Sequence, residues 1–215
     1  MKKPEKIMLL LLKEFRYHKH PTLRRTSKIK NPYKTLISCL LSLRTQDKNT
    51  AKASKSLFKI ADTPEKISKL PIKKLEKLVY SSGHYKKKSR TIKEVSKILI
   101  EKHNSKVPNT KPELLAIKGI GPKTANIVLS FAYGQNVIAV DTHVHRIPNR
   151  LGLVKTKTPE QTEPELGKLF PKKYWREINT TFILFGKNIC LPISPKCSQC
   201  PLNSLCPKVG VGIRR

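Results

Sequence analysis

Apolar residues recur every three or four positions along most of this chain, which is the spacing that buries one face of an α-helix. The segment from Ser89 to Lys102 is an example. Its apolar positions are Ile92, Val95, Ile98 and Leu99. We find no strict alternation of apolar and polar residues and no internal repeat. The pattern therefore predicts an all-α protein whose helices are joined by short loops.

Capping residues indicate where several helices begin. Thr63, followed by Pro64 and Glu65, is typical of an N-cap with a proline in the first turn. Asp47 is a predicted N-cap for a helix that ends near Ile60. Further helices are expected over residues 6–16, 32–41, 75–80, 89–102, 110–117, 123–132, 142–150, 159–170 and 173–187. The residues after Cys206 are expected to fray.

The charge of the chain narrows its possible partners. Lys and Arg number 45 against 14 Asp and Glu, a net charge of +31. Such a chain repels itself unless anions are nearby, and nucleic acid is the commonest polyanion in a cell. A lysine-rich proteome would explain part of this excess, but not the shortage of acids. The longest apolar run, Ile7 to Leu12, is too short to span a membrane. We therefore expect a nucleic-acid-binding protein with no membrane partner.

Four of the five cysteines lie in one short segment with the spacing C-x6-C-x2-C-x5-C. They are Cys190, Cys197, Cys200 and Cys206. Such a run can close around one metal centre. Disulfides fit less well, because the N-terminus does not resemble a signal peptide and we expect an intracellular protein. The spacing alone leaves zinc and an iron–sulfur cluster equally open. The fifth cysteine, Cys39, is expected to be a buried thiol.

Two glycines flank one apolar residue between two predicted helices. Gly119 and Gly121 permit a tight turn, and Ile120 is expected to insert into the core. The helix that follows adds unpaired N–H groups and a positive dipole end, which suit a DNA phosphate. The pattern predicts a helix–hairpin–helix that grips the DNA backbone without reading bases. Alone it is weak evidence, since many turns between helices contain glycine.

An amine and a carboxylate follow this turn. Lys123 lies just after it, and Asp141 comes 18 residues later in the segment 140–146. Each has an ordinary explanation, because Asp141 is placed to cap a helix from Thr142 and Lys123 to contact a phosphate or solvent. Together they would make chemical sense at a sugar. The amine would attack the anomeric carbon, and the carboxylate would stabilise the developing positive charge or assist proton transfer.

The hairpin with Lys123, the segment 140–146 with Asp141 and the cysteine run together resemble endonuclease III, a base-excision DNA glycosylase of the helix–hairpin–helix superfamily. The resemblance extends from about residue 30 to residue 207. It implies that the four cysteines hold a [4Fe–4S] cluster. It also implies two helical domains flanking a DNA-binding cleft. These are a six-helix barrel at residues 24–135 and an iron–sulfur cluster domain formed by residues 1–23 and 136–215.

The resemblance further implies a bifunctional DNA glycosylase/AP lyase in base excision repair. A damaged base is flipped out of the duplex, Lys123 forms a Schiff base at C1′, and β-elimination cuts the strand 3′ to the abasic site. The expected partner is double-stranded DNA with oxidised pyrimidines or abasic sites. The enzyme is expected to be a monomer, cytoplasmic and nucleoid-associated in a prokaryote.

Two alternatives stand beside this function. One is a monofunctional mismatch glycosylase, and the other is a non-catalytic, cluster-bearing DNA-binding protein. The lysine at position 123 favours the bifunctional enzyme, because the adenine and thymine-mismatch branches of the superfamily lack a lysine there.

Two loops depart from the best-known bacterial pattern. Residues 41–47, with Arg44 and Gln46, resemble the loop that fills the gap left by the flipped base, and Arg44 stands where glutamine is familiar. Residues 82–86 resemble the intercalating wedge, and His84 stands where leucine is familiar. Both replacements can still stack or hydrogen-bond, so they affect the opposite-base preference and not the reaction class. A solvated loop histidine is the alternative for His84.

The other expected DNA contacts are Gly119, Ile120 and Gly121 of the hairpin, His143 and Lys196. His143 either lines the substrate pocket or packs between helices. Lys196, between two of the cluster cysteines, either contacts a phosphate or is a solvated charge.

Overall fold

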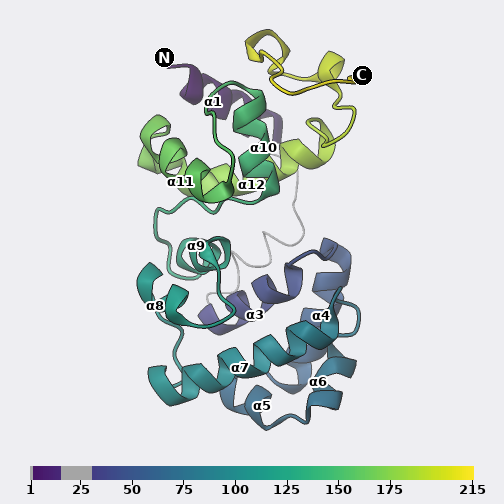
Figure 1. Ribbon diagram of the computed structural model, residues 1–215, viewed down its shortest axis with the longest axis vertical. Helices are drawn as coiled ribbons and strands as arrows, with labels where there is room; N and C mark the ends of the chain where they lie inside the picture. The colour runs from purple at the N-terminus through teal and green to yellow at the C-terminus, as the bar shows by residue number, and fades with distance from the viewer. Residues whose placement is uncertain (1, 16–30) are drawn as a thin grey trace. The chain divides into compact units, whose positions relative to one another are not determined.

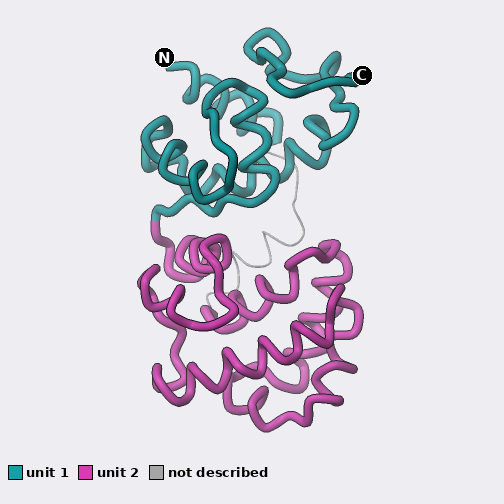
Figure 2. The backbone as a smooth tube through the Cα atoms, viewed as in Figure 1, with its two compact units in different colours: residues 1–20, 136–215 teal, residues 21–135 magenta. Residues whose placement is uncertain are grey.

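The computed structural model describes residues 2–15 and 31–215. These residues form eleven α-helices, three short 3-10 helices and no strand, so the predicted all-α fold is confirmed (Figure 1). None of the helices described is long and apolar enough to cross a membrane. The chain divides into two compact units, residues 1–20 with 136–215 and residues 21–135 (Figure 2). The domain boundary predicted between residues 23 and 24 lies outside the described residues.

The unit of residues 21–135 is built around a long central helix. Its helices are α3 (Pro32–Ser42), α4 (Asp47–Ile60), α5 (Pro64–Lys69), α6 (Ile72–Leu78), α7 (Tyr85–His103), α8 (Lys111–Ala116) and α9 (Pro122–Phe131). Helix α7 packs against α3, α5 and α6, and α3 also packs against α4 and α9. One face of helix α7 is fully buried in the core of this unit and carries Ile92, Val95 and Leu99.

The other unit combines the start of the chain with its last third. Its elements are α1 (Lys3–Phe15), α10 (Thr142–Arg150), α11 (Pro159–Leu169), η1 (Lys172–Tyr174), α12 (Trp175–Asn188), η2 (Cys197–Gln199) and η3 (Asn203–Leu205). Helix α12 packs against α1 and α10. Helix α1 buries Ile7, Met8 and Leu11 completely in a core that also contains Phe182. The first helix of the chain therefore completes a core built mainly from residues after 135.

Local capping explains where helices begin. The Thr63 hydroxyl accepts a hydrogen bond from the N–H of Lys66, as predicted for an N-cap. The prediction for Asp47 is wrong by one residue, since Gln46 is the N-cap of α4. The N–H of Thr50 donates to the Gln46 carbonyl, so the first helical turn starts there and Asp47 is the first helical residue. Its carboxylate still lies near the positive end of the helix dipole.

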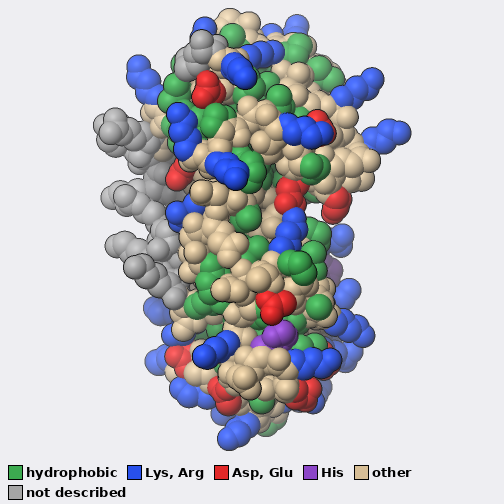
Figure 3. Space-filling view, turned by 90° about the vertical axis from the view of Figure 1, so that its left-hand side faces the viewer, with side chains coloured by type: hydrophobic (Ala, Val, Ile, Leu, Met, Phe, Trp, Pro, Cys, Tyr) green, Lys and Arg blue, Asp and Glu red, His purple; other side chains and the backbone are tan. Residues whose placement is uncertain are grey.

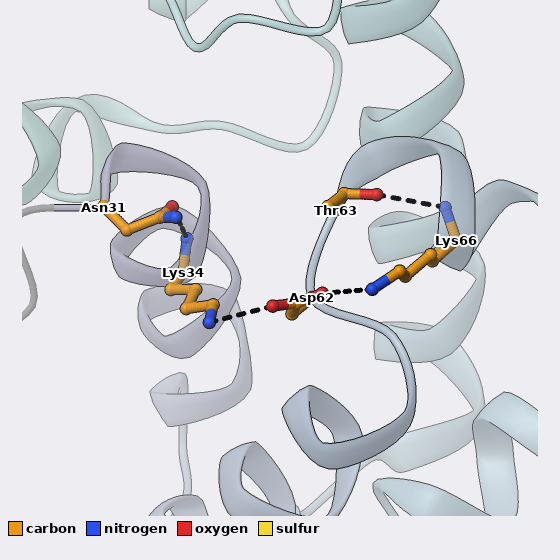
Figure 4. A network of polar contacts seen from close by, with 5 residues as sticks. All are labelled: Asn31, Lys34, Asp62, Thr63 and Lys66. Carbon is orange, nitrogen blue, oxygen red and sulfur yellow. Dashed lines mark hydrogen bonds and ion pairs between the residues drawn. The ribbon is translucent and has the colours of Figure 1, made fainter.

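An ion-pair network joins the starts of α3 and α5 (Figure 4). The Asp62 carboxylate lies 3.0 Å from Lys34 Nζ and 2.9 Å from Lys66 Nζ. Hydrogen bonds lower the pKa of Asp62 to about 2, and the bond from Lys66 has a larger effect than the bond from Lys34. The Asn31 side chain caps α3 by accepting from the N–H of Lys34. Because these groups are partly exposed, each pair contributes only about 0–1 kcal/mol.

Three sequence predictions need correction. The helix predicted at 75–80 is α6, Ile72–Leu78, because Pro71 provides its start. The helix predicted at 173–187 is divided into η1 and α12. The chain end predicted to fray is held by backbone hydrogen bonds. The N–H of Val209 donates to the Arg150 carbonyl at 3.1 Å, and the N–H of Arg215 donates to the Pro195 carbonyl at 2.9 Å.

Candidate functional site

The turn between α8 and α9 places its two glycines in different environments. Gly119 has a φ of +98°, and a Cβ there would lie 2.7 Å from Thr91 Cγ2, so both the backbone and the packing require glycine. Gly121 has a φ of −97° and no atom within 4 Å of a Cβ position, so its surface is open. Ile120 is 5% exposed and inserts into the core, as predicted. The turn therefore presents open backbone above a buried anchor.

Lys123 lies at the start of α9, immediately after this turn. Gly121 is the N-cap and has no side chain to satisfy the first amides of the helix, and Pro122 has no N–H. Lys123 is half-buried, and the next seven residues of α9 are buried. Beneath it, the Cys39 thiol donates to Thr124 Oγ1 at 3.7 Å and links α3 to α9. Cys39 is 6% exposed, so the prediction of a buried thiol is confirmed.

Asp141 is the N-cap of α10. Its Oδ1 accepts hydrogen bonds from the N–H groups of His143 and Val144, both at 2.9 Å. The capping explanation for Asp141 is therefore confirmed. Both hydrogen bonds end on one carboxylate oxygen, so Oδ2 takes no part in the cap. Capping fixes the orientation of the carboxylate and leaves this second oxygen available for another role.

His143 packs tightly against α12. A Cβ on Gly186 would lie 2.2 Å from His143 Nδ1, so only glycine admits the ring at this position. Arg146 Nη2 lies 3.2 Å from the same ring nitrogen. These contacts support the helix-packing explanation for His143 over a place in a substrate pocket.

The four clustered cysteines line one cavity. Its other lining residues are Arg150, Leu151, Phe185, Ile189, Pro195, Lys196, Asn203, Lys208 and Val211. None of the five cysteines forms a disulfide bond in this structure, which disfavours the disulfide alternative. Burial, and to a smaller extent the neighbouring cysteines, raise the pKa of the Cys200 thiol to about 11. A metal centre in this cavity must therefore displace thiol protons as it binds.

Two sulfur atoms of this cavity accept hydrogen bonds from the backbone. The N–H of Leu202 donates to Cys200 Sγ at 3.4 Å, and the N–H of Lys208 donates to Cys206 Sγ at 3.3 Å. Among the residues described, no three Cys, His, Asp or Glu side chains converge closely enough to share a single metal ion. A [4Fe–4S] cluster has a different requirement, because four thiolates bind a group of several irons from around a cavity. The cavity fits such a cluster.

Two arginines of α10 support the cysteine loop, and neither was predicted from the sequence. Arg150 donates to the carbonyls of Leu191 and Pro192 at 2.6 and 2.7 Å. It also lies 3.5 Å from Cys190 Sγ. Arg146 donates to the Cys190 carbonyl at 2.8 Å. The helix capped by Asp141 at its start thus holds the cysteine loop at its end. The pattern H-R-I-P-N-R, with two arginines one helical turn apart, was the available signal.

The two loops with predicted DNA contacts lie side by side in the unit of residues 21–135. The N–H of Gly83 donates to Thr45 Oγ1 at 3.0 Å. Arg44, Gln46 and His84 are exposed around this junction. Lys196, in contrast, is half-buried beside the cysteine cavity in the other unit.

Basic side chains are not confined to these loops. Figure 3 shows lysine and arginine dispersed over the visible face of both units, as the net charge of +31 requires. The surface charge therefore suits a polyanion without by itself marking a site.

Comparison with known proteins identifies two matching families. Residues 37–172 match the HhH-GPD superfamily base excision DNA repair protein family. Residues 190–206 match the iron–sulfur binding domain of endonuclease III. The second match covers all four cysteines of the cavity.

Individual relatives extend over most of the chain. Endonuclease III of Thermotoga maritima is 48% identical over 182 residues, which are 85% of this chain and 85% of the relative. A trapped endonuclease III–DNA covalent intermediate, an estranged-adenine complex, has 34% identity, a TM-score of 0.85 and 97% coverage of both chains. A thermostable thymine-DNA glycosylase has a TM-score of 0.85 over 96% of both chains. At 23% identity, this last likeness concerns the fold alone.

Proposed function

This chain belongs to the endonuclease III family of base excision DNA repair proteins, and from that premise we propose which of its residues carry out the reaction. It is a DNA glycosylase/AP lyase with an iron–sulfur cluster held by its four clustered cysteines. We assign the nucleophile to Lys123 and the supporting carboxylate to Asp141. The preferred substrates are oxidised pyrimidines, such as thymine glycol, in double-stranded DNA.

The reaction begins with an attack on the sugar of a flipped nucleotide. The neutral amine of Lys123 adds to C1′, the bond between C1′ and the base breaks, and the base leaves with a proton. Opening of the sugar ring then gives the Schiff base between Nζ and C1′. Removal of a proton from C2′ drives β-elimination, which breaks the bond to the 3′ phosphate oxygen. Water finally hydrolyses the Schiff base and returns the lysine.

The position of Lys123 is the observation that carries this assignment. It follows directly on the open backbone of the hairpin, where the unpaired amides of α9 suit a phosphate. A lysine in the first turn of that helix can reach the sugar next to a bound phosphate. The buried face of α9 and the Cys39–Thr124 contact hold the helix under it.

Asp141 is suited to the supporting role by its cap. The two amides that donate to Oδ1 hold the carboxylate in one orientation. Oδ2 is then free to stabilise positive charge at the sugar or to move a proton during base release. The two residues belong to different units of the chain, so we propose that DNA brings one sugar to both.

The DNA contacts follow from the same assignment. We propose that Gly119, Ile120 and Gly121 bind a phosphate without sequence preference. Arg44, Gln46 and His84 meet the bases around the lesion, and Lys196 contacts the backbone. We propose that one unit is the barrel domain and the other the cluster domain, and that both contact DNA. The enzyme works as a monomer, in the cytoplasm at the nucleoid if its source is a prokaryote.

The cluster has a structural part in this proposal. Cys190, Cys197, Cys200 and Cys206 hold it, and it fixes the loop around Lys196 for DNA. No step of the reaction passes through it.

Borohydride trapping on a duplex with thymine glycol tests the nucleophile. Borohydride reduces the Schiff base to a stable amine, so the wild-type protein should become covalently linked to DNA. Lys123→Gln should give no linked product and no strand cleavage, while its thermal unfolding and its affinity for the duplex stay close to wild type. Lys118→Gln is the matched control, because it removes an exposed lysine from the same hairpin.

The outcomes separate the alternatives. Base release by the wild type without any covalent product would establish a monofunctional glycosylase. Binding without base release would establish a non-catalytic DNA-binding protein. A covalent product with Lys123→Gln would move the nucleophile to another amine.

A further inference from the structure

Two exposed residues with disfavoured backbone conformations lie at the junction of the α3–α4 and α6–α7 loops. Arg44 has a φ of +50° and His84 a φ of +58°, so both are in the left-handed region of backbone conformation that residues other than glycine rarely adopt. A Cβ on Gly83 would lie 3.1 Å from the Arg44 carbonyl oxygen, which shows how closely the loops approach. Such conformations persist only where the surrounding structure imposes them, and they concentrate at functional sites.

A buried lysine lies directly beneath this junction. Lys88, in the first turn of α7, is 8% exposed. Its Nζ donates to the Leu41 carbonyl at 2.8 Å, to Thr45 Oγ1 at 2.7 Å and to Ser82 Oγ at 2.8 Å. A lysine ammonium has three N–H groups, and here each has an acceptor. The three acceptors come from the end of α3, the loop after it and the loop before α7.

The acceptors are themselves connected. The Ser82 hydroxyl donates to the Leu41 carbonyl at 2.8 Å. Thr45 Oγ1 accepts from both Lys88 Nζ and the N–H of Gly83. Lys88 is therefore the centre of a network that fixes one loop against the other. Removing it would leave buried oxygen atoms without their donor, which disfavours the observed arrangement.

Lys88 differs in kind from the neighbouring lysines of α7. Lys86 and Lys87 are exposed and can meet solvent or phosphate. The ammonium of Lys88 is buried and fully used by protein oxygens, so it has no N–H left for DNA. Burial lowers the pKa of Lys88 to about 8, and the ammonium remains the main form at neutral pH. Burying an ammonium group costs desolvation free energy, so we expect this lysine to have a structural role at its position.

We propose that Lys88 is a positioning residue for lesion recognition, which holds the Arg44 loop and the His84 loop together so that both side chains enter the duplex as one rigid element. The inference rests on the proposed function, because it requires that these loops meet DNA. Lys88 acts through the loops and touches neither substrate nor reacting atoms. Its loss should therefore weaken recognition of the lesion and leave the chemistry of Lys123 intact.

Binding to two duplexes distinguishes this role from an electrostatic one. We would compare Lys88→Met with Lys87→Met, which removes the same charge one residue earlier on the surface. The probes are a duplex with a tetrahydrofuran abasic analogue and the same duplex undamaged. Lys88→Met should reduce the preference for the abasic duplex about tenfold, with the same salt dependence as wild type. Any loss caused by Lys87→Met should be equal for both duplexes.

A single-stranded substrate tests whether the chemistry survives. Single-stranded DNA with an abasic site has no base stack to enter, so the loops are not required. Borohydride trapping of Lys88→Met at saturating concentrations of this strand should proceed at the wild-type rate. On the abasic duplex at low concentration, trapping should fall about tenfold, in line with the lost preference. Equal losses on both substrates would show a general defect and would overturn the proposal.

Combining substitutions tests whether Lys88 acts through the side chains of the two loops. In a protein that already carries Arg44→Ala and His84→Ala, adding Lys88→Met should cause little further loss of lesion preference. An additive loss would mean that Lys88 acts elsewhere. If Lys88→Met does not fold, Thr45→Val takes its place, because it removes the hydroxyl that links Lys88 to Gly83. The same loss of lesion preference is expected.

The failure of this inference can be told apart from that of the proposed function. Wild-type protein that forms no covalent product with any abasic DNA would refute the function itself. Wild-type protein that is trapped and prefers the lesion, beside a Lys88→Met or Thr45→Val protein with the same preference, would refute only the role of Lys88.

Discussion

Lys88 and Lys123 show how the surroundings of a lysine decide what it does in a chain with many basic residues. Lys123 is half-buried beside open backbone, where its amine can reach a ligand. Lys88 is buried, and each of its three N–H groups has a protein acceptor. The first is suited to chemistry and the second to holding structure in place.

The titration of Lys88 gives a prediction for alkaline pH. Its pKa falls from an ordinary 10.5 to about 8 in the folded protein because of burial. Between these values this lysine binds more protons in the unfolded chain than in the folded one, so its contribution to the free energy of unfolding rises with pH. The free energy of unfolding of wild type should gain about 3 kcal/mol relative to Lys88→Met between about pH 8 and pH 10.5. Urea denaturation at several pH values measures this difference, and parallel pH curves would contradict it.

Single residues could be predicted from the sequence where the interaction is local. The caps at Thr63 and Asp141 depend on amides two or three residues away, so the sequence contains both partners. Lys88 could not be assigned in the same way. It shares the buried face of α7 with Ile92 and Val95, but it stands in the run Lys86 to Lys88, which indicates a solvated surface. Its acceptors, Leu41 and Thr45, lie more than 40 residues away.

At the scale of elements, the hairpin between α8 and α9 combines a structural glycine with an open one. The sequence places Gly119 and Gly121 symmetrically about Ile120, and only the structure distinguishes them. Position 119 requires glycine because of its left-handed backbone conformation and the short distance to Thr91. A Cβ at Gly121 would meet no other atom within 4 Å.

Alanine substitutions should separate these two roles. Gly119→Ala should lose about 1–3 kcal/mol of stability, because of its left-handed backbone and the short contact with Thr91. Gly121→Ala should stay within about 1 kcal/mol of wild type. Its methyl group should nevertheless weaken binding to damaged and undamaged duplex equally, by crowding a phosphate. Denaturation curves and fluorescence anisotropy measure the two effects. Unchanged binding by Gly121→Ala would place the phosphate elsewhere.

Helix α10 is a second element with a role at each end, since Asp141 begins it and Arg150 supports the cysteine loop at its close. Arg150→Met removes the two hydrogen bonds to Leu191 and Pro192. Because these two hydrogen bonds are only partly buried, we expect them to contribute about 1–2 kcal/mol together, so the cluster should be lost about tenfold faster in the presence of a chelator. The decay of its visible absorption measures this rate. Arg176→Met is the control, as Arg176 is exposed on α12, and an equal decay of both variants would contradict the prediction.

The sequence predicted the presence of each helix more reliably than the residues at which the helix begins and ends. Each predicted helical segment corresponds to one of the α-helices described, because periodicity reflects which face is buried. Starts were missed where polar residues occupy the first turn, as at Tyr85 in α7. The held chain end was missed because its partners, Arg150 and Pro195, are long-range backbone groups without a sequence signal.

At the scale of the whole molecule, the net charge of +31 dominates the encounter with DNA. Basic groups dispersed over both units attract any duplex, whereas we propose that the few residues of the two loops supply the preference for a lesion. On this proposal, affinity and selectivity arise from different parts of the molecule.

Salt should separate these two properties. With about six to ten phosphate contacts, affinity should fall about 10³- to 10⁵-fold between about 50 and 200 mM salt. The loss should be nearly equal for damaged and undamaged duplex, so the ratio of the two affinities should change little. Anisotropy titrations at four salt concentrations test both points. A shallow dependence would show that the phosphate contacts are few despite the charge.

The order of the two units along the chain has a consequence for synthesis. Residues 21–135 form one unit without interruption, but α1 belongs with residues 136–215. At about 5–20 residues per second, the ribosome needs roughly ten to thirty seconds between finishing α1 and finishing α12. For that time the apolar face of α1, with Ile7, Met8 and Leu11, has no partner of its own. The amphipathic helix α1 therefore stays exposed during synthesis, even after residues 21–135 are complete. We expect a chaperone that shields nascent chains to bind this helix.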